Sequence, residues 1–275
     1  MSNEEYGAKI GKTKFGSDIM ELFGYPLWAI VLICVGVFTA AVVDAIGGGG
    51  GLISLPIYLL VGIPYHHALG TNKMSSCIGT AASTFRYLKS GFVNWRLAWG
   101  AILLAVGGSY VGTSLQLRVD ETYLQYTLLV VLPVVAAVML FCKSQLPELP
   151  GEIKPAAQRA IVWGASLIIG IYDGFYGPGT GTFLLLAYCY LGKMDVRTAS
   201  GNVKLANLAS NVGSLATALF AGTVVVPIGL LAAVFSIAGH YLGAGLNIKN
   251  GSKIVQPVIL IVLVLLAAKV ITDML

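Results

Sequence analysis

The sequence DAIGGGGGLISLP, residues 44–56, places five consecutive glycines between two apolar stretches. Glycine inside a helix costs about 1 kcal/mol relative to alanine, so a helix that enters this stretch is expected to end there. The apolar run that follows covers residues 51–62. It is shorter than the about 20 residues that a helix needs to cross a bilayer core. The stretch therefore predicts two helices that meet at a glycine turn.

The composition around this turn is that of an integral membrane protein. The chain has 275 residues, of which 57% are hydrophobic and only 11% are charged, against about 25% charged residues in a soluble domain. Residues 45–72 and 205–248 carry no Asp, Glu, Lys or Arg. The basic residues behind the net charge of +5 are dispersed between apolar segments. We therefore expect the lipid bilayer as the partner, and no nucleic acid.

The chain contains an internal repeat. A shift of 131 residues brings ALGTNKMSS (68–76) onto ASGNVKLAN (199–207) and thereby Lys73 onto Lys204. The same shift brings GGSYVG (107–112) onto AGHYLG (238–243). With a slip of one residue, the glycines of 47–51 match alternate glycines of YGPGTG (176–181). Two copies of one structural unit are therefore expected.

Each copy reads as five apolar segments. They lie at about 26–46, 51–62, 66–89, 95–117 and 122–142, and again at about 160–176, 181–192, 196–219, 226–247 and 254–272. The sequence thus predicts an all-α membrane protein with the following parts: a polar tail (1–24), a first membrane repeat (25–142), a connector (143–157) and a second membrane repeat (158–275).

Loop charges predict that the two repeats are inverted. The turn at 86–96 holds three basic residues and is expected to be cytoplasmic, whereas the equivalent turn at 217–227 has no charge. Opposite orientation requires an odd number of crossings per repeat. Three full spans and one re-entrant or broken helical hairpin satisfy this, which makes about eight membrane segments by hydropathy. Both termini are then non-cytoplasmic and the connector is cytoplasmic.

The glycine turns are candidate anion sites. A helix that starts inside the membrane presents free N–H groups and a positive dipole end, which suit an anion. The candidate residues are Gly49, Gly50 and Gly51 in the first repeat and Gly179, Thr180 and Gly181 in the second. The alternative is that such glycines only allow close helix packing, the role that we expect for Gly108, Gly112, Gly239 and Gly243.

Polar stripes beside the turns add candidate ligands. A lysine within an apolar segment is a functional candidate, with snorkelling to the interface as the alternative. The stripes comprise Lys73 with Ser76, and Lys204 with Asn207 and Asn211, and the candidates Asn72 and Asn202 come just before the two lysines. Asp44 and Asp173 precede the two turns and are expected either to pair with the lysines or to take up a coupling proton. No cofactor or metal site is expected, because the neighbouring His66 and His67 lack a nearby carboxylate or cysteine. These two histidines and His240 can titrate.

The chain resembles the TauE/SafE family of sulfite exporters and toluene-sulfonate-uptake permeases. The resemblance covers about residues 25–273. It is carried by GGGGGLISLPIYLLVGIPYHHALGTNKMSS (47–76), RYLKSGFVNW (86–95), GPGTGTFLLL (177–186) and ASGNVKLANLASNVGSLATALFAGTV (199–224). It implies a secondary transporter of the prokaryotic cytoplasmic membrane, with about eight membrane segments, for sulfite or small organosulfonates such as sulfoacetate. Pro178 and Thr180 interrupt the glycine pattern of the second repeat, so the two half-sites are expected to be unequal.

The sequence therefore predicts a carrier that holds a small anionic substrate near the bilayer midplane and works by alternating access. An anion channel on the same scaffold, or a carrier of a different small anion, is the alternative. A membrane enzyme is disfavoured, because it would need clustered His, Glu or Asp in the spans and the longest uncharged run holds only His240 among these. Whether two copies form a homodimer is left open.

Overall fold

The computed structural model describes residues 21–22, 24–124, 126–127, 130–131 and 149–250. Most of the segment expected at 122–142, all of the segment expected at 254–272, and most of the tail at 1–24 lie outside the described residues.

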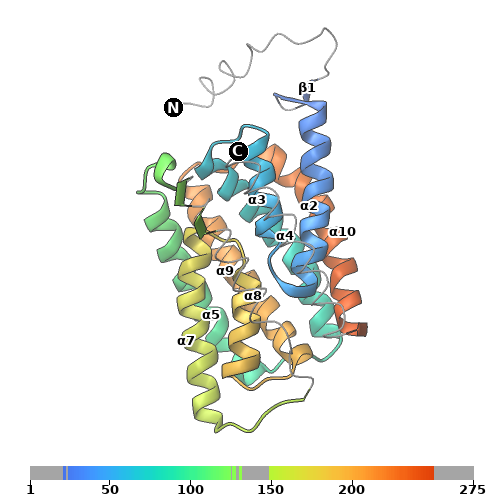
Figure 1. Ribbon diagram of the computed structural model, residues 1–275, viewed down its shortest axis with the longest axis vertical. Coiled ribbons are helices and arrows are strands. Elements are labelled where there is room, and N and C mark those ends of the chain that lie inside the picture. The colour runs from blue at the N-terminus through green and yellow to red at the C-terminus, as the bar shows by residue number, and fades with distance from the viewer. Residues whose placement is uncertain (1–20, 23, 125, 128–129, 132–148, 251–275) are drawn as a thin grey trace.

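The described part of the chain is helical except for its turns and one small β-hairpin (Figure 1). The hairpin consists of β1 (Glu21–Leu22) and β2 (Tyr25–Pro26). The helices of the first repeat are α2 (Leu27–Gly47), α3 (Gly51–Leu60), α4 (Tyr65–Lys89) and α5 (Trp95–Gln116). Those of the second repeat are α7 (Pro155–Phe175), α8 (Thr180–Leu186), the π-helix η1 (Ala187–Leu191), α9 (Val196–Phe220) and α10 (Val226–Asn250).

These bounds follow the apolar segments closely, and the short helices after the glycine turns are present as expected. Among the described residues, three helices are long and apolar enough to cross a membrane, namely α2, α5 and α10. The largest difference concerns α7, which begins at Pro155 rather than near residue 160. Proline is favoured in the first helical turn, because its missing N–H would have no helical partner there.

The two repeats pack against each other through equivalent helices. Helix α5 packs on α7 and α9, and its counterpart α10 packs on α2 and α4. Glycines bring these helices into close contact. A β-carbon at Gly108 or Gly112 would run into the α7 backbone, and one at Gly239 or Gly243 would run into the α2 backbone. The packing role expected for these four glycines is confirmed.

Helices α4 and α9 are antiparallel neighbours. Near the start of α4, Gly70 faces the carbonyl of Thr223, which follows α9, and near the start of α9, Gly201 faces the carbonyl of Phe92, which follows α4. The hydroxyl of Thr71 also accepts a hydrogen bond of 2.9 Å from the N–H of Val225. The N-terminal half of each helix therefore lies beside the C-terminal half of the other.

Apolar and polar side chains are distributed as in a membrane protein. Large apolar side chains lie on the outer surface, among them Leu103, Phe220 (94% exposed) and Val234. Polar side chains of α4 and α9 are buried inside, including Asn72 and Asn207. An extensive apolar exterior over a polar interior suits contact with lipid rather than with water.

Candidate functional site

Each glycine turn joins the end of a long helix to the start of a short one. Gly48 (φ 70°) and Gly49 (φ 118°) connect α2 to α3, and Gly177 (φ 85°) and Gly179 (φ 86°) connect α7 to α8. Residues with a side chain rarely adopt these positive φ angles, which explains why glycine is needed at the turns.

The tips of the two hairpins touch. A β-carbon at Gly181 would lie 2.8 Å from the Cα of Gly48, so only glycine allows this approach. The hydroxyl of Thr182 donates to the carbonyls of Gly47 (2.9 Å) and Gly48 (2.7 Å). The starts of α3 and α8 both line one small cavity beside this contact.

Two buried ion pairs cross between the repeats at this point. Lys73 Nζ lies 2.7 Å from Asp173 Oδ2, and Lys204 Nζ lies 2.9 Å from Asp44 Oδ2. The lysine side chains are only 4% and 3% exposed, so they do not snorkel to a surface. Of the two roles expected for the aspartates, pairing with the lysines is confirmed. Each lysine pairs with the aspartate of the opposite repeat.

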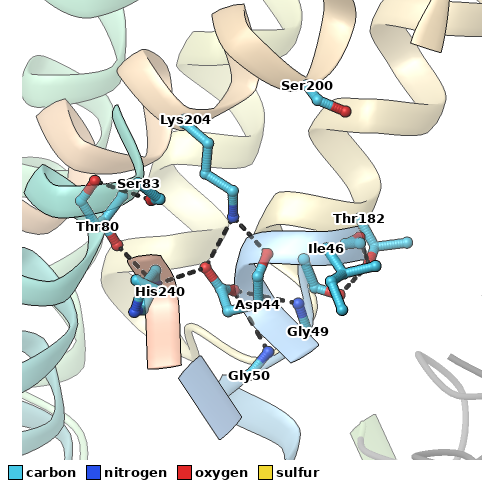
Figure 2. Close-up of polar contacts among 12 residues, drawn as sticks. Asp44, Ile46, Gly49, Gly50, Thr80, Ser83, Thr182, Ser200, Lys204 and His240 are labelled. Carbon is cyan, nitrogen blue, oxygen red and sulfur yellow. Dashed lines mark hydrogen bonds and ion pairs between the residues drawn. The ribbon is translucent and has the colours of Figure 1, made fainter. Parts of the chain in front are cut away.

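Asp44 is the centre of the first half-site (Figure 2). Its Oδ1 accepts hydrogen bonds of 3.3 Å from the N–H groups of Gly49 and Gly50, and its Oδ2 also faces His240 Nε2 at 3.2 Å. Lys204 donates to the Asp44 carbonyl as well. Two of the backbone donors expected to bind substrate therefore already hold a carboxylate of the chain itself. Their neighbour, the N–H of Gly51, has no partner among the described residues.

Asp173 is held by hydroxyl groups instead. Thr180 Oγ1 donates to its Oδ1 at 2.8 Å, and Ser210 Oγ donates to its Oδ2. Lys73 Nζ also donates a hydrogen bond of 3.3 Å to the side-chain carbonyl of Asn211. The two half-sites thus share the ion pair and differ in the remaining donors.

A small cavity lies between the half-sites. Its lining includes most of the residues predicted from the sequence: Asp44, Gly49, Gly50, Gly51, Asn72, Lys73, Ser76, Asp173, Gly179, Thr180, Gly181, Asn207 and Asn211. Two predicted residues are absent from it. Asn202 donates to the Thr198 carbonyl of its own helix at 2.8 Å, and Lys204 reaches the cavity only through Asp44.

The lining also contains residues that the sequence did not single out as ligands, among them Ser54, Gly177, Ser236 and His240. Gly177 was detectable from its match to Gly47 in the repeat. His240 could not be placed, because its equivalent in the first repeat is Ser109 and no spacing relates it to Asp44.

The cavity has a volume of about 30 Å³, which is room for a water molecule or two. The site therefore has little free space in this conformation. Among the described residues, no group of three His, Cys, Asp or Glu side chains is arranged to hold a metal ion.

Curated bacterial proteins named as probable membrane transporters resemble this chain along most of its length. One from Haemophilus influenzae is 33% identical, covering 91% of this chain and 96% of its own. One from Sinorhizobium, named ORF9, is 31% identical, covering 89% and 93%, and YfcA of Escherichia coli K12 is 29% identical, covering 85% and 86%. No solved structure matches the chain significantly. The family model described as Sulfite exporter TauE/SafE matches residues 32–270, and the protein therefore belongs to this family of membrane transporters.

Proposed function

We propose that this protein is a secondary transporter that moves a small sulfur oxyanion, sulfite or an organosulfonate such as sulfoacetate, across the prokaryotic cytoplasmic membrane. The family description supports the class of substrate. The observation that carries the proposal is the cavity between the hairpin tips, where Lys73 meets backbone and amide donors and Lys204 is held behind Asp44.

The donors around the cavity fit an anion with several oxygens. The N–H groups of Gly51, Gly179 and Gly181 have no partner among the described residues. The side-chain carbonyl oxygen of Asn72 is buried without a partner. Since the two ends of an amide can exchange places, this side chain can turn its NH₂ group to a ligand. Together with Lys73, these groups can replace the water shell of a small oxyanion.

We propose that the two repeats around this site have inverted topologies. Antiparallel packing of α4 and α9, and the reciprocal contacts of α5 with α7 and of α10 with α2, support a pseudo-two-fold relation between the halves. We place three full spans and one hairpin in each repeat, with both termini outside and the connector at 143–157 in the cytoplasm.

The crossed ion pairs suggest how substrate couples to movement. Each lysine is held by an aspartate of the other repeat, so motion between the repeats must break or shift these pairs. An arriving anion competes with the carboxylate for the ammonium group and lowers the cost of that change. Alternating access then opens the cavity to one side at a time.

The test is a ligand screen followed by transport. Purified protein is mixed with sulfite, sulfoacetate, thiosulfate, sulfate, taurine and simple carboxylates, and the shift in melting temperature is recorded. We expect sulfite or sulfoacetate to bind more tightly than taurine, because the ammonium group of taurine would be repelled by Lys73. In proteoliposomes, a carrier shows saturable counterflow of the bound anion. Failure of every anion to bind would refute the proposal, and a large unitary current would establish the channel instead.

A further inference from the structure

His240, on α10, contacts the first half-site through both ring nitrogens. Nε2 lies 3.2 Å from Asp44 Oδ2, and Nδ1 lies 3.0 Å from the backbone carbonyl of Ser236. A carbonyl and an ionised carboxylate can only accept hydrogen bonds. A neutral imidazole has one N–H, so it can donate to only one of these oxygens. The protonated ring donates to both, which makes this position suited to hold a proton.

Neighbouring hydroxyls allow the neutral ring as well. Thr80 Oγ1 lies 3.4 Å from Nε2 and can donate to it, and Ser236 Oγ lies 3.3 Å from Nδ1. The ring can therefore lose its proton without leaving an unpaired nitrogen. The ring can therefore bind and release a proton within a transport cycle.

The proton sets the net charge of the cavity. The charged groups around His240 are Asp44 on α2 and Lys204 on α9, with Lys73 and Asp173 across the cavity. On α4, Arg86 lies beyond them, over the Tyr241 ring at 4.4 Å. The two ion pairs sum to zero, so the buried site is neutral when His240 is neutral and carries +1 when His240 is protonated. A buried anion is costly unless it is compensated, so it favours the protonated ring.

Only one half-site is built for this ring. A β-carbon at Gly79 would lie 2.6 Å from His240 Nδ1, so glycine leaves the space that the ring occupies. In the second repeat the equivalent position is Ser210, whose hydroxyl donates to Asp173. The equivalent of His240 is Ser109, which bonds to the Val106 carbonyl of its own helix. Because of this asymmetry, the two half-sites together offer one proton position, at His240.

We propose that His240 binds one proton together with the substrate anion, so that transport of the oxyanion is coupled to protons at this residue. The inference rests on the proposed function and extends it by naming the coupling ion and the residue that holds it. Asp44 stays ionised as the partner of Lys204, and His240 supplies the charge that the anion needs.

The test measures sulfoacetate affinity by calorimetry between about pH 6 and pH 9, a range in which this ligand keeps both charges. We expect the dissociation constant of the unmodified protein to rise with pH at the alkaline end, by up to about tenfold for each pH unit. Titrations in two buffers with different heats of ionisation should show uptake of about one proton for each anion bound. Binding without proton uptake and without pH dependence would overturn the inference while leaving the proposed function intact.

Two variants and a control identify the residue that takes up the proton. His240→Gln should bind weakly at every pH, with the slope lost, whereas His67→Gln, which lies outside the cavity, should behave like the unmodified protein. Asp44→Asn leaves the site at +1 with a neutral ring, so it should bind sulfoacetate with little dependence on pH even if His240→Gln fails to fold. Persistence of the full slope in His240→Gln or in Asp44→Asn would show that another group takes the proton. If sulfoacetate and the other anions bind at no pH, the proposed function itself is wrong.

Discussion

Lys73 and Lys204 each form a buried ion pair, and Lys73 also lines the cavity. From the sequence alone, removing either lysine is expected to weaken binding and leave folding intact. The buried pairs change this expectation, because Lys73→Ala would leave the carboxylate of Asp173, 3% exposed, without its counter-charge.

We expect Lys73→Ala to lower the free energy of unfolding by about 3–5 kcal/mol, the usual cost of breaking a buried ion pair. The double variant Lys73→Gln with Asp173→Asn removes both charges and should recover most of this loss. Thermal unfolding in detergent measures both. Equal melting temperatures of Lys73→Ala and the unmodified protein would contradict the buried pair.

Asn72 and Asn202 allow a controlled comparison of two similar residues. Both are buried and both precede a lysine closely, but only Asn72 lines the cavity. Loss of one hydrogen bond to a bound anion is worth about 1.5–3 kcal/mol, since a charged group is involved. Asn72→Ala should therefore weaken sulfoacetate or sulfite binding about tenfold or more, and Asn202→Ala should leave affinity nearly unchanged. Similar affinities of the two variants, measured by calorimetry, would remove Asn72 from the site.

At the scale of the helices, the close contact of α5 with α7 depends on small residues. A β-carbon at Gly112 would run into the carbonyl of Ile171 and lie 3.0 Å from the backbone nitrogen of Phe175, whereas one at Gly107 would meet nothing within 4 Å. We expect Gly112→Ala to lower the melting temperature by forcing the helices apart. Gly107→Ala should be neutral or slightly stabilising, because alanine favours the helix. A melting temperature of Gly112→Ala at or above that of Gly107→Ala would contradict this packing.

At the first hairpin tip, the surroundings of Gly50 differ from those that the sequence pattern suggests. If the backbone at Gly50 bound an anion, a side chain there would fill the space of the anion, and Gly50→Val would report on the site directly. In the structure, a β-carbon at Gly50 would lie 2.5 Å from the Ala40 carbonyl and 2.7 Å from Asp44 Cβ. The substitution would therefore disturb α2 and cannot separate binding from folding.

At the scale of the whole molecule, the proposed inverted topology can be tested through two loops. Ser90 follows α4 and Ala221 follows α9, and the antiparallel packing of these 25-residue helices places the loops at opposite ends. Single cysteines at 90 and 221 in a background without the native cysteines should react with impermeant reagents from opposite sides of the membrane. Position 90 is expected on the cytoplasmic side. Labelling of both cysteines from the same side of the membrane would contradict the inverted repeat.

The sequence by itself determined the membrane class, the internal repeat, the break at residues 47–51 and the stripe that carries Lys73 and Ser76. These features depend on composition and on spacing along one helix, because the 3.6-residue period places nearby side chains on one face.

Only the tertiary structure decided which groups meet. Asp44 and Lys204 are 160 residues apart, and Asp44 and His240 are 196 residues apart. Their contact depends on how α2, α9 and α10 cross, which no local spacing encodes. Local geometry also contributed, because the Asp44 carboxylate accepts from the N–H groups of Gly49 and Gly50 at the end of its own helix, and Asn202 donates to the Thr198 carbonyl within α9. The residue types of the site are thus readable from the chain, whereas its charge balance arises from helix packing across the two repeats.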